Sequence, residues 1–264
     1  MSITHQLRFN YIKFCRYILK RKFIRIFSGP LKGYKWSTSY NYEYIIGDYE
    51  HKDNMDIFCS WLKADTVFYD LGANVGYFSF IANRYITNGV IYSFEPIPYN
   101  INIFKEHLRL NKEKIKQQNI QLLPYAISSK DGEIVFSHDP LLIEGNTYIT
   151  SSATYTNSKE TISIKCYSLD GLLQNGYKKP DVIKIDVEGA EYDVLLGAVE
   201  TLKKFKPNIL LATHDCHLPA VQQNCKDFLQ GLGYELTELG RHNKHIAGLN
   251  DYIAIHPDNF VRNG

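Results

Sequence analysis

Along the chain, short apolar runs alternate with longer segments in which apolar residues recur at helical spacing. The runs at residues 66–71, 90–94, 120–123, 182–185 and 208–213 each have the length and composition of a buried strand. Between most of them, apolar residues recur every three or four positions, which is typical of a helix with one buried face. The pattern predicts strands connected by helices.

Strands that alternate with helices form βαβ units, in which neighbouring strands run parallel and helices cover both faces of the sheet. The last two apolar runs, residues 234–239 and 252–256, have no helical segment between them. We therefore expect these two strands to pair antiparallel at one edge. The predicted fold is α/β and Rossmann-like, with a mostly parallel sheet.

The chain changes in composition at about residue 65. Residues 1–64 hold a basic segment and a stretch rich in Tyr, Gly and Ser, which predict a helix and an irregular preamble or short hairpin packed on the core. Residues 65–264 form the α/β domain. A polar insertion at about 137–161 is too long for an ordinary connection, so we expect a lid or binding segment, with a disordered surface loop as the alternative.

Positive charge is concentrated at the start of the chain. Residues 1–32 contain eight Lys or Arg and no acid, although the formal net charge of the whole chain is only +2. The cations interleave with apolar residues at helical spacing, namely Leu7, Tyr11, Phe14 and Ile18. We expect a surface helix whose apolar stripe packs on the body. The alternative is that residues 1–27 make peripheral contact with an anionic membrane.

The overall composition is that of a globular protein. Hydrophobic residues make up 44% and charged residues 22% of the chain, close to the averages of folded domains. The five cysteines form no CxxC pair, which favours reduced thiols and a cytoplasmic location. The sequence has no run of about 18 apolar residues and so predicts no membrane span.

The loop after the first strand has the residues of a nucleoside-binding turn. The strand ends at Asp70, followed by Gly72, Asn74 and Gly76. Glycine allows a tight turn and the close approach of a flat ligand, and Asn74 is placed to cap the next helix. Glu95 follows the second strand, where an acid can accept hydrogen bonds from both hydroxyls of a ribose.

The charge of this loop discriminates between nucleoside cofactors. A pyrophosphate-binding turn has the pattern G-x-G-x-x-G with free amides, whereas this loop reads D-x-G-x-N-x-G. The leading acid would repel a pyrophosphate but suits a cofactor with a positive charge and an ammonium group. We therefore expect S-adenosylmethionine, a sulfonium without phosphate, in preference to NAD.

A second group of acids follows the fourth strand. Asp186, Glu188 and Glu191 lie close together in sequence and are interrupted by Gly189. Close acids repel one another unless a cation is near, so we expect them to face a cationic ligand or a substrate hydroxyl. Glu191 falls in the first turn of the next helix, where an acid meets the positive end of the helix dipole.

Together these motifs resemble those of a known family. "FYDLGANVGYFS" with "FEP", followed by "IKIDVEGAEYDVLLGA", is closely similar to the FkbM family of S-adenosylmethionine-dependent methyltransferases. The resemblance runs from about Thr66 to Pro207 and includes Leu169-Asp170 as the family's "LD" signature. It implies a class I methyltransferase fold of seven strands, with the last antiparallel. It also implies methyl transfer to a hydroxyl of a sugar or a polyketide-type natural product.

The resemblance also implies roles for individual residues. The residues implied to line the methionine end of the cofactor are Asp70, Gly72, Asn74 and Gly76. Glu95 is implied to hold the ribose, and Ala126 and Ile127 to lie beside the adenine. Asp186, which we also count as cofactor-binding, and Glu188 are implied to face the reacting centre.

One position departs from the family pattern. The family commonly carries a Glu near the end of the fifth strand, followed two residues on by a His. Residues 211–215 read Leu-Ala-Thr-His-Asp, which keeps His214 but lacks the Glu. The role of that acid is therefore in doubt, and Asp215 is the candidate substitute.

Methyl transfer to oxygen is assisted by a base that takes the hydroxyl proton. His214, with an ordinary pKa near 6.5, is the first catalytic candidate, followed by Asp186 and Glu188. The alternative is a structural histidine bonded to Asp215. These four residues could also hold Mg²⁺, but their spacing matches no dedicated metal motif, so we expect no metal.

The expected function is S-adenosylmethionine-dependent O-methylation of a sugar or glycoconjugate. The alternatives are a methyltransferase for a small natural product and a non-catalytic cofactor-binding subunit, which the missing Glu favours. A third alternative is an NAD-dependent oxidoreductase. We expect no nucleic-acid partner, because the basic residues lie in one terminal segment while the predicted site is acidic.

Overall fold

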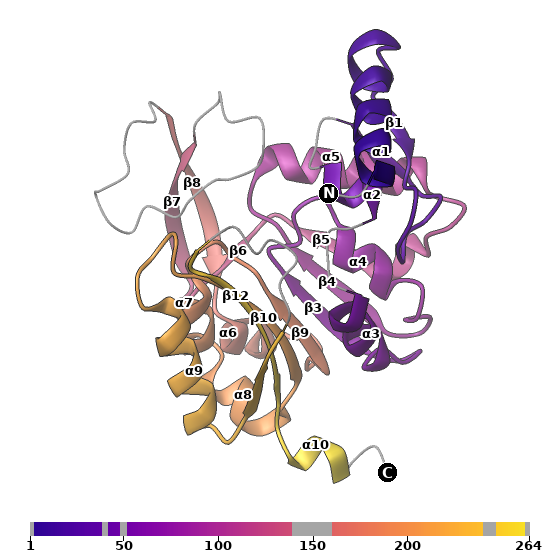
Figure 1. Cartoon of the computed structure of the whole chain (residues 1–264). Helices are drawn as coiled ribbons and strands as arrows, with labels where there is room; N and C mark the ends of the chain where they lie inside the picture. The colour runs from indigo at the N-terminus through magenta and orange to yellow at the C-terminus, as the bar shows by residue number, and fades with distance from the viewer. Residues whose placement is uncertain (1–2, 39–41, 48–51, 139–159, 240–246, 262–264) are drawn as a thin grey trace.

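The computed structural model describes residues 3–38, 42–47, 52–138, 160–239 and 247–261. Its centre is a seven-stranded sheet in the order β11-β12-β10-β9-β3-β4-β5 (Figure 1). The strands are β3 (Val67–Leu71), β4 (Val90–Phe94), β5 (Ile120–Leu123), β9 (Val182–Ile185), β10 (Asn208–His214), β11 (Glu235–Glu238) and β12 (Leu249–Ile255).

Six of these strands point in the same direction, and β12, the last strand in the chain, runs against them. β3 pairs in parallel with β4 and β9, β4 with β5, and β9 with β10. β12 is antiparallel to both β10 and β11, so it lies one place in from the edge that β11 forms. The predicted mostly parallel α/β sheet, with its last two strands paired antiparallel at one edge, is confirmed.

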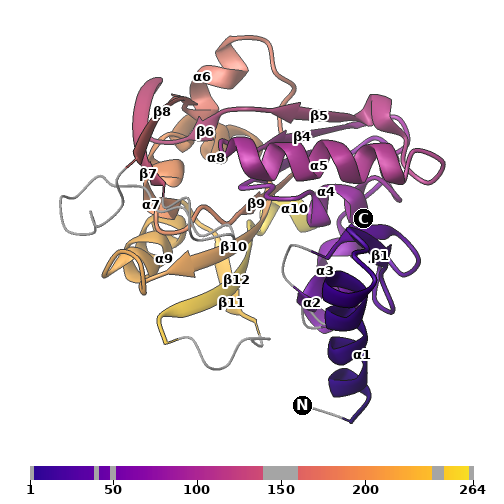
Figure 2. The same cartoon turned by 90° about the horizontal axis from the view of Figure 1, so that it is seen from above.

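Helices cover both faces of the sheet, because alternate strand residues point to opposite sides. Phe68 and Ile91 belong to one buried cluster, whereas Val67 and Tyr69 belong to the other. The connecting and C-terminal helices are α4 (Tyr77–Ala82), α5 (Pro98–Leu110), α6 (Leu169–Gln174), α7 (Glu191–Leu196), α8 (Val199–Phe205), α9 (Val221–Gly231) and α10 (Asp258–Val261), with a 3₁₀ turn at Gln117–Asn119. The view from above shows α5 on one side of the sheet and α9 on the other (Figure 2).

A second, three-stranded sheet stands beside the main one. β6 (Ala126–Ile127) pairs in parallel with β8 (Glu160–Tyr167), which pairs antiparallel with β7 (Gly132–His138). β7 and β8 flank the predicted polar insertion, and residues 139–159 of that insertion lie outside the described residues. Whether it acts as a lid stays a prediction.

The N-terminal region contains more regular structure than the sequence predicts. Its elements are α1 (Ile3–Lys13), a π-helical segment (Phe14–Ile18), β1 (Phe23–Arg25), β2 (Lys35–Ser37), α2 (Tyr42–Ile46) and α3 (Lys52–Ser60). β1 and β2 form an antiparallel pair, which agrees with the predicted short hairpin. The expectation of an irregular stretch up to residue 64 is wrong for α2 and α3.

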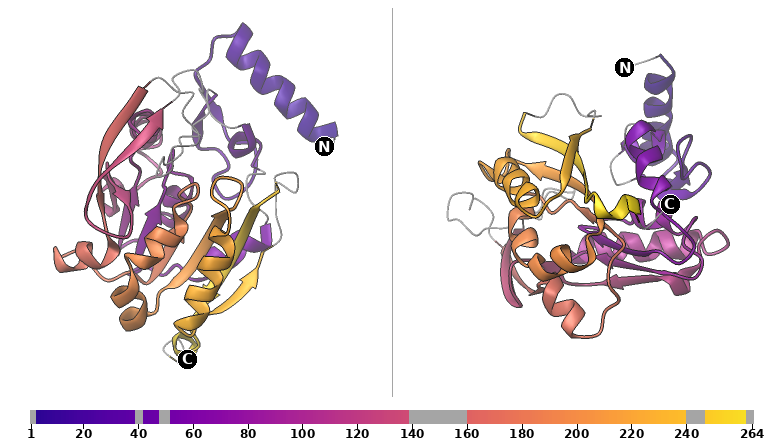
Figure 3. Two further views of the ribbon diagram at one scale, coloured as in Figure 1. Left: turned by 90° about the vertical axis from the view of Figure 1, so that its left-hand side faces the viewer. Right: turned by 90° about the horizontal axis from the view of Figure 1, so that it is seen from below.

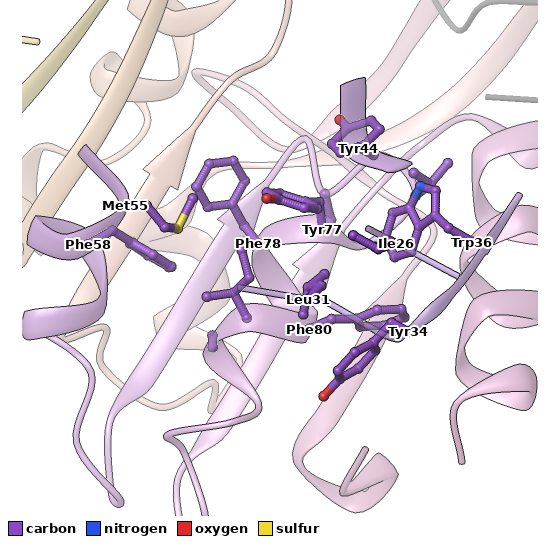
Figure 4. Packing of buried hydrophobic residues seen from close by; sticks show 14 of the residues in the cluster. Ile26, Leu31, Tyr34, Trp36, Tyr44, Met55, Phe58, Tyr77, Phe78 and Phe80 are labelled. Atoms are coloured by element: carbon purple, nitrogen blue, oxygen red, sulfur yellow. The ribbon is translucent and has the colours of Figure 1, made fainter. Parts of the chain in front are cut away.

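Trp36 on β2 anchors this region to the α/β domain. Its ring is fully buried, stacks on His107 of α5 with ring centres 3.9 Å apart, and meets Tyr77 and Phe80 of α4 edge to face. Figure 4 shows Trp36, Tyr44 and Tyr77 gathered beside one another. The N-terminal region therefore shares one hydrophobic core with α4 and α5.

The apolar stripe of the N-terminal helix does not pack on the body as expected. Leu7, Tyr11, Phe14 and Ile18 are between 45% and 67% exposed. The opposite side makes the contact instead, through buried residues such as Ile12 and the edge-to-face pair of Phe9 with Tyr42. In Figure 3 the N-terminal end of the helix extends beyond the rest of the chain. Among the described residues, no helix has the length and apolar character needed to cross a membrane.

Candidate active site

The chain order reverses between β3 and β9, so two loops meet at the carboxyl ends of these strands. Asp70 is in register with Lys184, and Leu71 with Ile185. Gly72 has φ +76°, and a Cβ there would come within 1.9 Å of the Asp186 carbonyl oxygen. Only glycine lets the loops approach this closely. Such a switch point is where open α/β sheets bind their ligands.

Lys184 connects the two loops electrostatically. Its Nζ donates to the Gly72 carbonyl at 2.8 Å and lies 3.2 Å from Asp186 Oδ2 and 3.7 Å from Asp70 Oδ1. Burial alone would lower the pKa of Lys184, but the two carboxylates outweigh it and hold the pKa above its ordinary value. Lys184 does not stand out in the sequence, because the acids that follow it dominate the motif.

Asp70 is buried beneath the loop. It is 0% exposed, and its Oδ2 accepts a hydrogen bond from Ser79 at 2.5 Å. Burial raises the pKa of Asp70, although Lys184 opposes the shift. The carboxylate is therefore placed to orient Lys184. Direct contact between Asp70 and a ligand stays a prediction.

Asn74 does not cap a helix. α4 begins at Tyr77 with Gly76 as its N-cap, so the expected cap at Asn74 is wrong. Asn74 has φ +52°, and its buried Oδ1 has no hydrogen-bond partner among the described residues. An unpartnered buried acceptor is costly unless a ligand fills it. Gly76 has φ +96° and lies against Phe104, so packing accounts for this glycine.

Glu95 connects the loop after β4 to the loop after β3. Its Oε2 accepts from the Asn74 backbone N–H and its Oε1 from the Ile97 backbone N–H, both at 2.8 Å. Asn100 donates to Oε1 at 3.3 Å, and burial raises the pKa of Glu95 to about 7. A carboxylate offers about four lone-pair positions, so one more donor can be accepted. Ribose binding by Glu95 stays a prediction.

The two residues predicted beside the adenine lie on β6. Ala126 and Ile127 are buried, and Ala126 shares a small apolar cluster with Ile97, two residues after Glu95. The loops after β4 and β5 therefore meet at an apolar surface next to the Glu95 carboxylate. Contact with an adenine is a prediction that this arrangement favours.

The second acidic motif surrounds His214 at the end of β10. His214 Nε2 lies 3.6 Å from both Asp186 Oδ1 and Glu188 Oε2. On the other side of the ring, Nδ1 lies 2.8 Å from Glu191 Oε1. Glu188 has φ +56°, an uncommon backbone conformation for a residue other than glycine. The three predicted catalytic residues, His214, Asp186 and Glu188, are therefore brought together.

The expectation of an ordinary pKa for His214 is wrong. Burial alone would lower this pKa, but the hydrogen bond to Glu191 and the charges of the neighbouring acids raise it to about 10. Burial raises the pKa of Glu188 to about 7, although 34% of its side chain is exposed and solvent moderates the effect. Burial would also raise the pKa of Asp186, but Lys184 and His214 outweigh it and lower it. With no ligand bound, the imidazole is charged at neutral pH.

Glu191 supplies the acid that β10 lacks. It is fully buried at the start of α7, and its Oε1 also accepts from the backbone N–H of Gly189 at 2.9 Å. The sequence suggests for Glu191 only a favourable interaction with the helix dipole. The structure adds its contact with His214. Asp215 is not the substitute, because its Oδ1 accepts from the Gln222 backbone N–H at the start of α9.

The same groups could serve as metal ligands. One ligand atom each from Asp186, Glu188 and His214 lies within 4.8 Å of the others. A metal ion would have to displace the proton from His214, because an imidazole binds a metal only in its neutral form. The expectation that no metal binds here stays a prediction.

A sheet with this strand order and an acid-edged switch point defines a class I methyltransferase. Residues 70–240 match the methyltransferase FkbM domain, and the chain belongs to the FkbM methyltransferase family. The protein is a methyltransferase.

Two relatives and one solved structure illustrate the family. Hexuronic acid methyltransferase AglP of Haloferax volcanii is 28% identical, covering 70% of this chain and 71% of that protein. Methyltransferase sdnD of Sordaria araneosa is 24% identical, covering 67% of this chain and 76% of that protein. The crystal structure of an FkbM methyltransferase from Methylobacillus flagellatus matches with a TM-score of 0.52 at 15% identity, covering 73% of this chain and 44% of that one. The last likeness concerns the fold alone.

Proposed function

We propose that the protein transfers a methyl group from S-adenosylmethionine to a hydroxyl of a sugar or glycoconjugate. The proposal rests on the arrangement around His214. Buried Glu191 contacts its Nδ1 atom, while its Nε2 atom faces Asp186 and Glu188. The family supports methyl transfer, and a relative named as a hexuronic acid methyltransferase supports a sugar acceptor.

The residues at the switch point fit this cofactor. The unpartnered Asn74 Oδ1 and the spare acceptor position of Glu95 suit hydroxyl or ammonium donors, and the surface around Ile97 and Ala126 suits an adenine. Asp186 and Glu188 suit a cationic centre. When bound, S-adenosylmethionine supplies a methyl group on a positively charged sulfur.

His214 would act as the base through its Nε2 atom. A cation bound beside Asp186 and Glu188 competes with the imidazolium for these carboxylates, so the pKa of His214 falls when the site fills. The neutral ring can then accept a hydroxyl proton at Nε2. The Nδ1–H bond to Glu191 fixes the ring and stabilises the imidazolium that forms.

The other interpretations make different predictions. A non-catalytic subunit loses its support, because Glu191 provides His214 with an acid and the family is enzymatic. A small natural product as acceptor is the main alternative for the substrate. If the reaction needs a divalent metal at His214, a chelator should abolish turnover, and we expect it to have no effect.

The test measures S-adenosylhomocysteine release with a panel of uronic acids, neutral sugars and phenolic natural products. We expect turnover with sugar acceptors, and a decrease of 10²-fold or more, on the order of what a general base contributes, in His214→Gln. His256→Gln serves as the matched control and should retain activity, because His256 follows the end of β12 whereas His214 pairs with Leu249 at its start. Absence of cofactor binding in calorimetry at millimolar concentration would refute the proposal.

A further inference from the structure

The N-terminal helical segment presents an apolar surface to solvent. Its exposed large apolar side chains, with exposed fractions from 45% to 67%, are Leu7, Tyr11, Phe14, Tyr17, Ile18 and Leu19. They make up more than half of the exposed large apolar side chains of the described residues. A concentrated apolar surface of this kind is typical of an interaction site.

This surface is held facing outward. Ile12 and Cys15 are buried against the body, and Arg8 donates to the Ser28 hydroxyl at 3.0 Å. Arg16 donates to the Tyr42 hydroxyl at 3.1 Å. Because the opposite side of the segment is fixed in this way, the exposed side chains cannot turn inward to cover themselves.

Cations surround the apolar side chains, and no acid is near them in sequence. Lys13, Lys20, Arg21 and Lys22 are exposed, and the first acid in the chain is Glu43. An apolar face bordered by Lys and Arg is the pattern of a helix that lies in the interface of an anionic bilayer. The charges attract the bilayer and the apolar side chains enter it.

A groove beside this segment adds a place for an anionic headgroup. It has a volume of about 340 Å³, and its lining includes Tyr11, Arg21, Arg25 and Lys35. Arg25 Nη1 donates to the Gly33 carbonyl at 2.9 Å, which fixes the guanidinium at the groove. Three cations around a groove with an aromatic wall suit a phosphate on a glycerol or similar stem.

The charge distribution distinguishes a bilayer from other occupants. A second copy of the chain would bring two cation-rich segments together, and like charges in contact are costly. A nucleic acid would neutralise the cations but leave Leu7, Phe14 and Ile18 exposed to water. An anionic bilayer satisfies both the charges and the apolar side chains.

We propose that residues 7–25 together with Lys35 form a membrane-binding surface for anionic phospholipid bilayers. The apolar side chains enter the headgroup region and a lipid phosphate occupies the groove. This inference does not depend on the proposed methyl transfer, and it concerns peripheral attachment only.

The test is co-sedimentation of the full chain with vesicles of phosphatidylcholine alone or with about one third phosphatidylglycerol. We expect binding to the anionic vesicles only, with affinity that falls as salt increases. Lys20→Gln/Arg21→Gln/Lys22→Gln should weaken binding about 100-fold, at roughly tenfold or less for each charge. Phe14→Ser/Ile18→Ser should weaken it by about tenfold or more.

Matched controls carry the same changes elsewhere on the surface. Lys112→Gln/Lys178→Gln/Lys179→Gln removes three other exposed cations, and Val135→Ser removes another exposed apolar side chain. Both should bind as the parent protein does. Circular dichroism establishes that each variant is folded.

Competition and oligomeric state complete the test. Glycerophosphoglycerol should displace the protein from vesicles more strongly than chloride at equal ionic strength, and equal displacement would overturn the role of the groove. Equal binding to neutral and anionic vesicles would contradict the proposal. Absence of binding would also contradict it, and a dimer that dissociates in Phe14→Ser/Ile18→Ser would identify a second copy as the occupant instead.

Discussion

Glu191 is the buried acid that orients the His214 ring, with its Oε1 atom 2.8 Å from Nδ1. Sequence patterns place Glu191 at a helix start and assign it to the helix dipole, because its contact with His214 joins residues 23 positions apart. No periodicity in one sequence reports such a contact. The sequence predicts that the acids of the motif form one site. It does not predict that Glu191 contacts Nδ1 of His214 while Asp186 and Glu188 face Nε2.

Glu191→Gln tests the role of Glu191 at Nδ1 of His214. We expect the pKa of His214 in the ligand-free protein to fall from about 10 towards its ordinary value, because the hydrogen bond that raises it most is weakened and one stabilising charge is lost. Turnover should fall by about 10²-fold or more, since the ring loses its fixed orientation. Binding of S-adenosylhomocysteine should change little.

Nuclear magnetic resonance titration of the His214 ring measures the pKa, and S-adenosylhomocysteine release measures turnover. Glu200→Gln, at an exposed position on α8, is the control for loss of one charge. An unchanged titration of His214 in Glu191→Gln would contradict the assignment.

Lys184 tests the electrostatics of the switch point. Replacing it by Met leaves Asp70 buried without its cation and Asp186 without its closest one, and breaking a buried pair typically costs about 3–5 kcal/mol. We expect a loss of that order in the free energy of unfolding, measured with urea. Lys203→Met, which breaks only an exposed pair with Glu200, should be nearly neutral. Similar losses in both variants would refute this account.

At the scale of elements, the "LD" signature has a structural explanation. Asp170 on α6 accepts hydrogen bonds from the backbone N–H groups of Glu200 and Thr201, at the start of α8, and from the Thr201 hydroxyl. One side chain therefore satisfies free donors at the first turn of another helix and holds α6 against α8.

His107 on α5 connects β2 to the loop before α4. Its Nδ1 donates to the Val75 carbonyl and its Nε2 accepts from the Ser37 backbone N–H, so the ring must be neutral. Burial lowers its pKa to about 4. Between pH 6.5 and 4 the unfolded chain binds a proton that the folded chain does not, so stability falls as the pH drops through this window.

His107→Gln should reduce that pH dependence. At pH 7 we expect the variant to be less stable, because a buried partner is lost. Between pH 6.5 and 4 its free energy of unfolding should decline less than that of the parent, by up to about 3 kcal/mol. Urea unfolding at several pH values provides the measurement, with His256→Gln as control. Parallel declines in parent and variant would contradict a neutral His107.

The predictability of each element follows from its surroundings. The central strands are buried on both faces, so their apolar runs identify them directly. α3 mixes polar and apolar residues and is only partly buried, so its sequence does not identify it. In the N-terminal helix, the exposed apolar residues have the same spacing as those of a buried helix face. Periodicity shows that a helix face is apolar but does not show what covers it. The prediction that Leu7 and Ile18 pack on the body is wrong for this reason.

At the scale of the whole molecule, the division at residue 65 does not separate two folding units. Trp36 lies in the same core as Phe80 of α4, and one continuous cluster includes residues from both parts. Trp36→Ala should therefore cost about 3–5 kcal/mol and lower the melting temperature of the whole chain in a single transition. Calorimetry that resolves two independent transitions, with only one shifted, would contradict a shared core.

The ring of His107 has a mechanical consequence. Both of its nitrogens are engaged, one with the N-terminal hairpin and one with the Val75 carbonyl, next to the turn expected to receive the nucleoside. The hairpin cannot tilt without pulling on that turn. If the hairpin is attached to a surface, the orientation of the candidate active site relative to that surface is therefore fixed. A protein attached in this way would bind its acceptors from one constant direction.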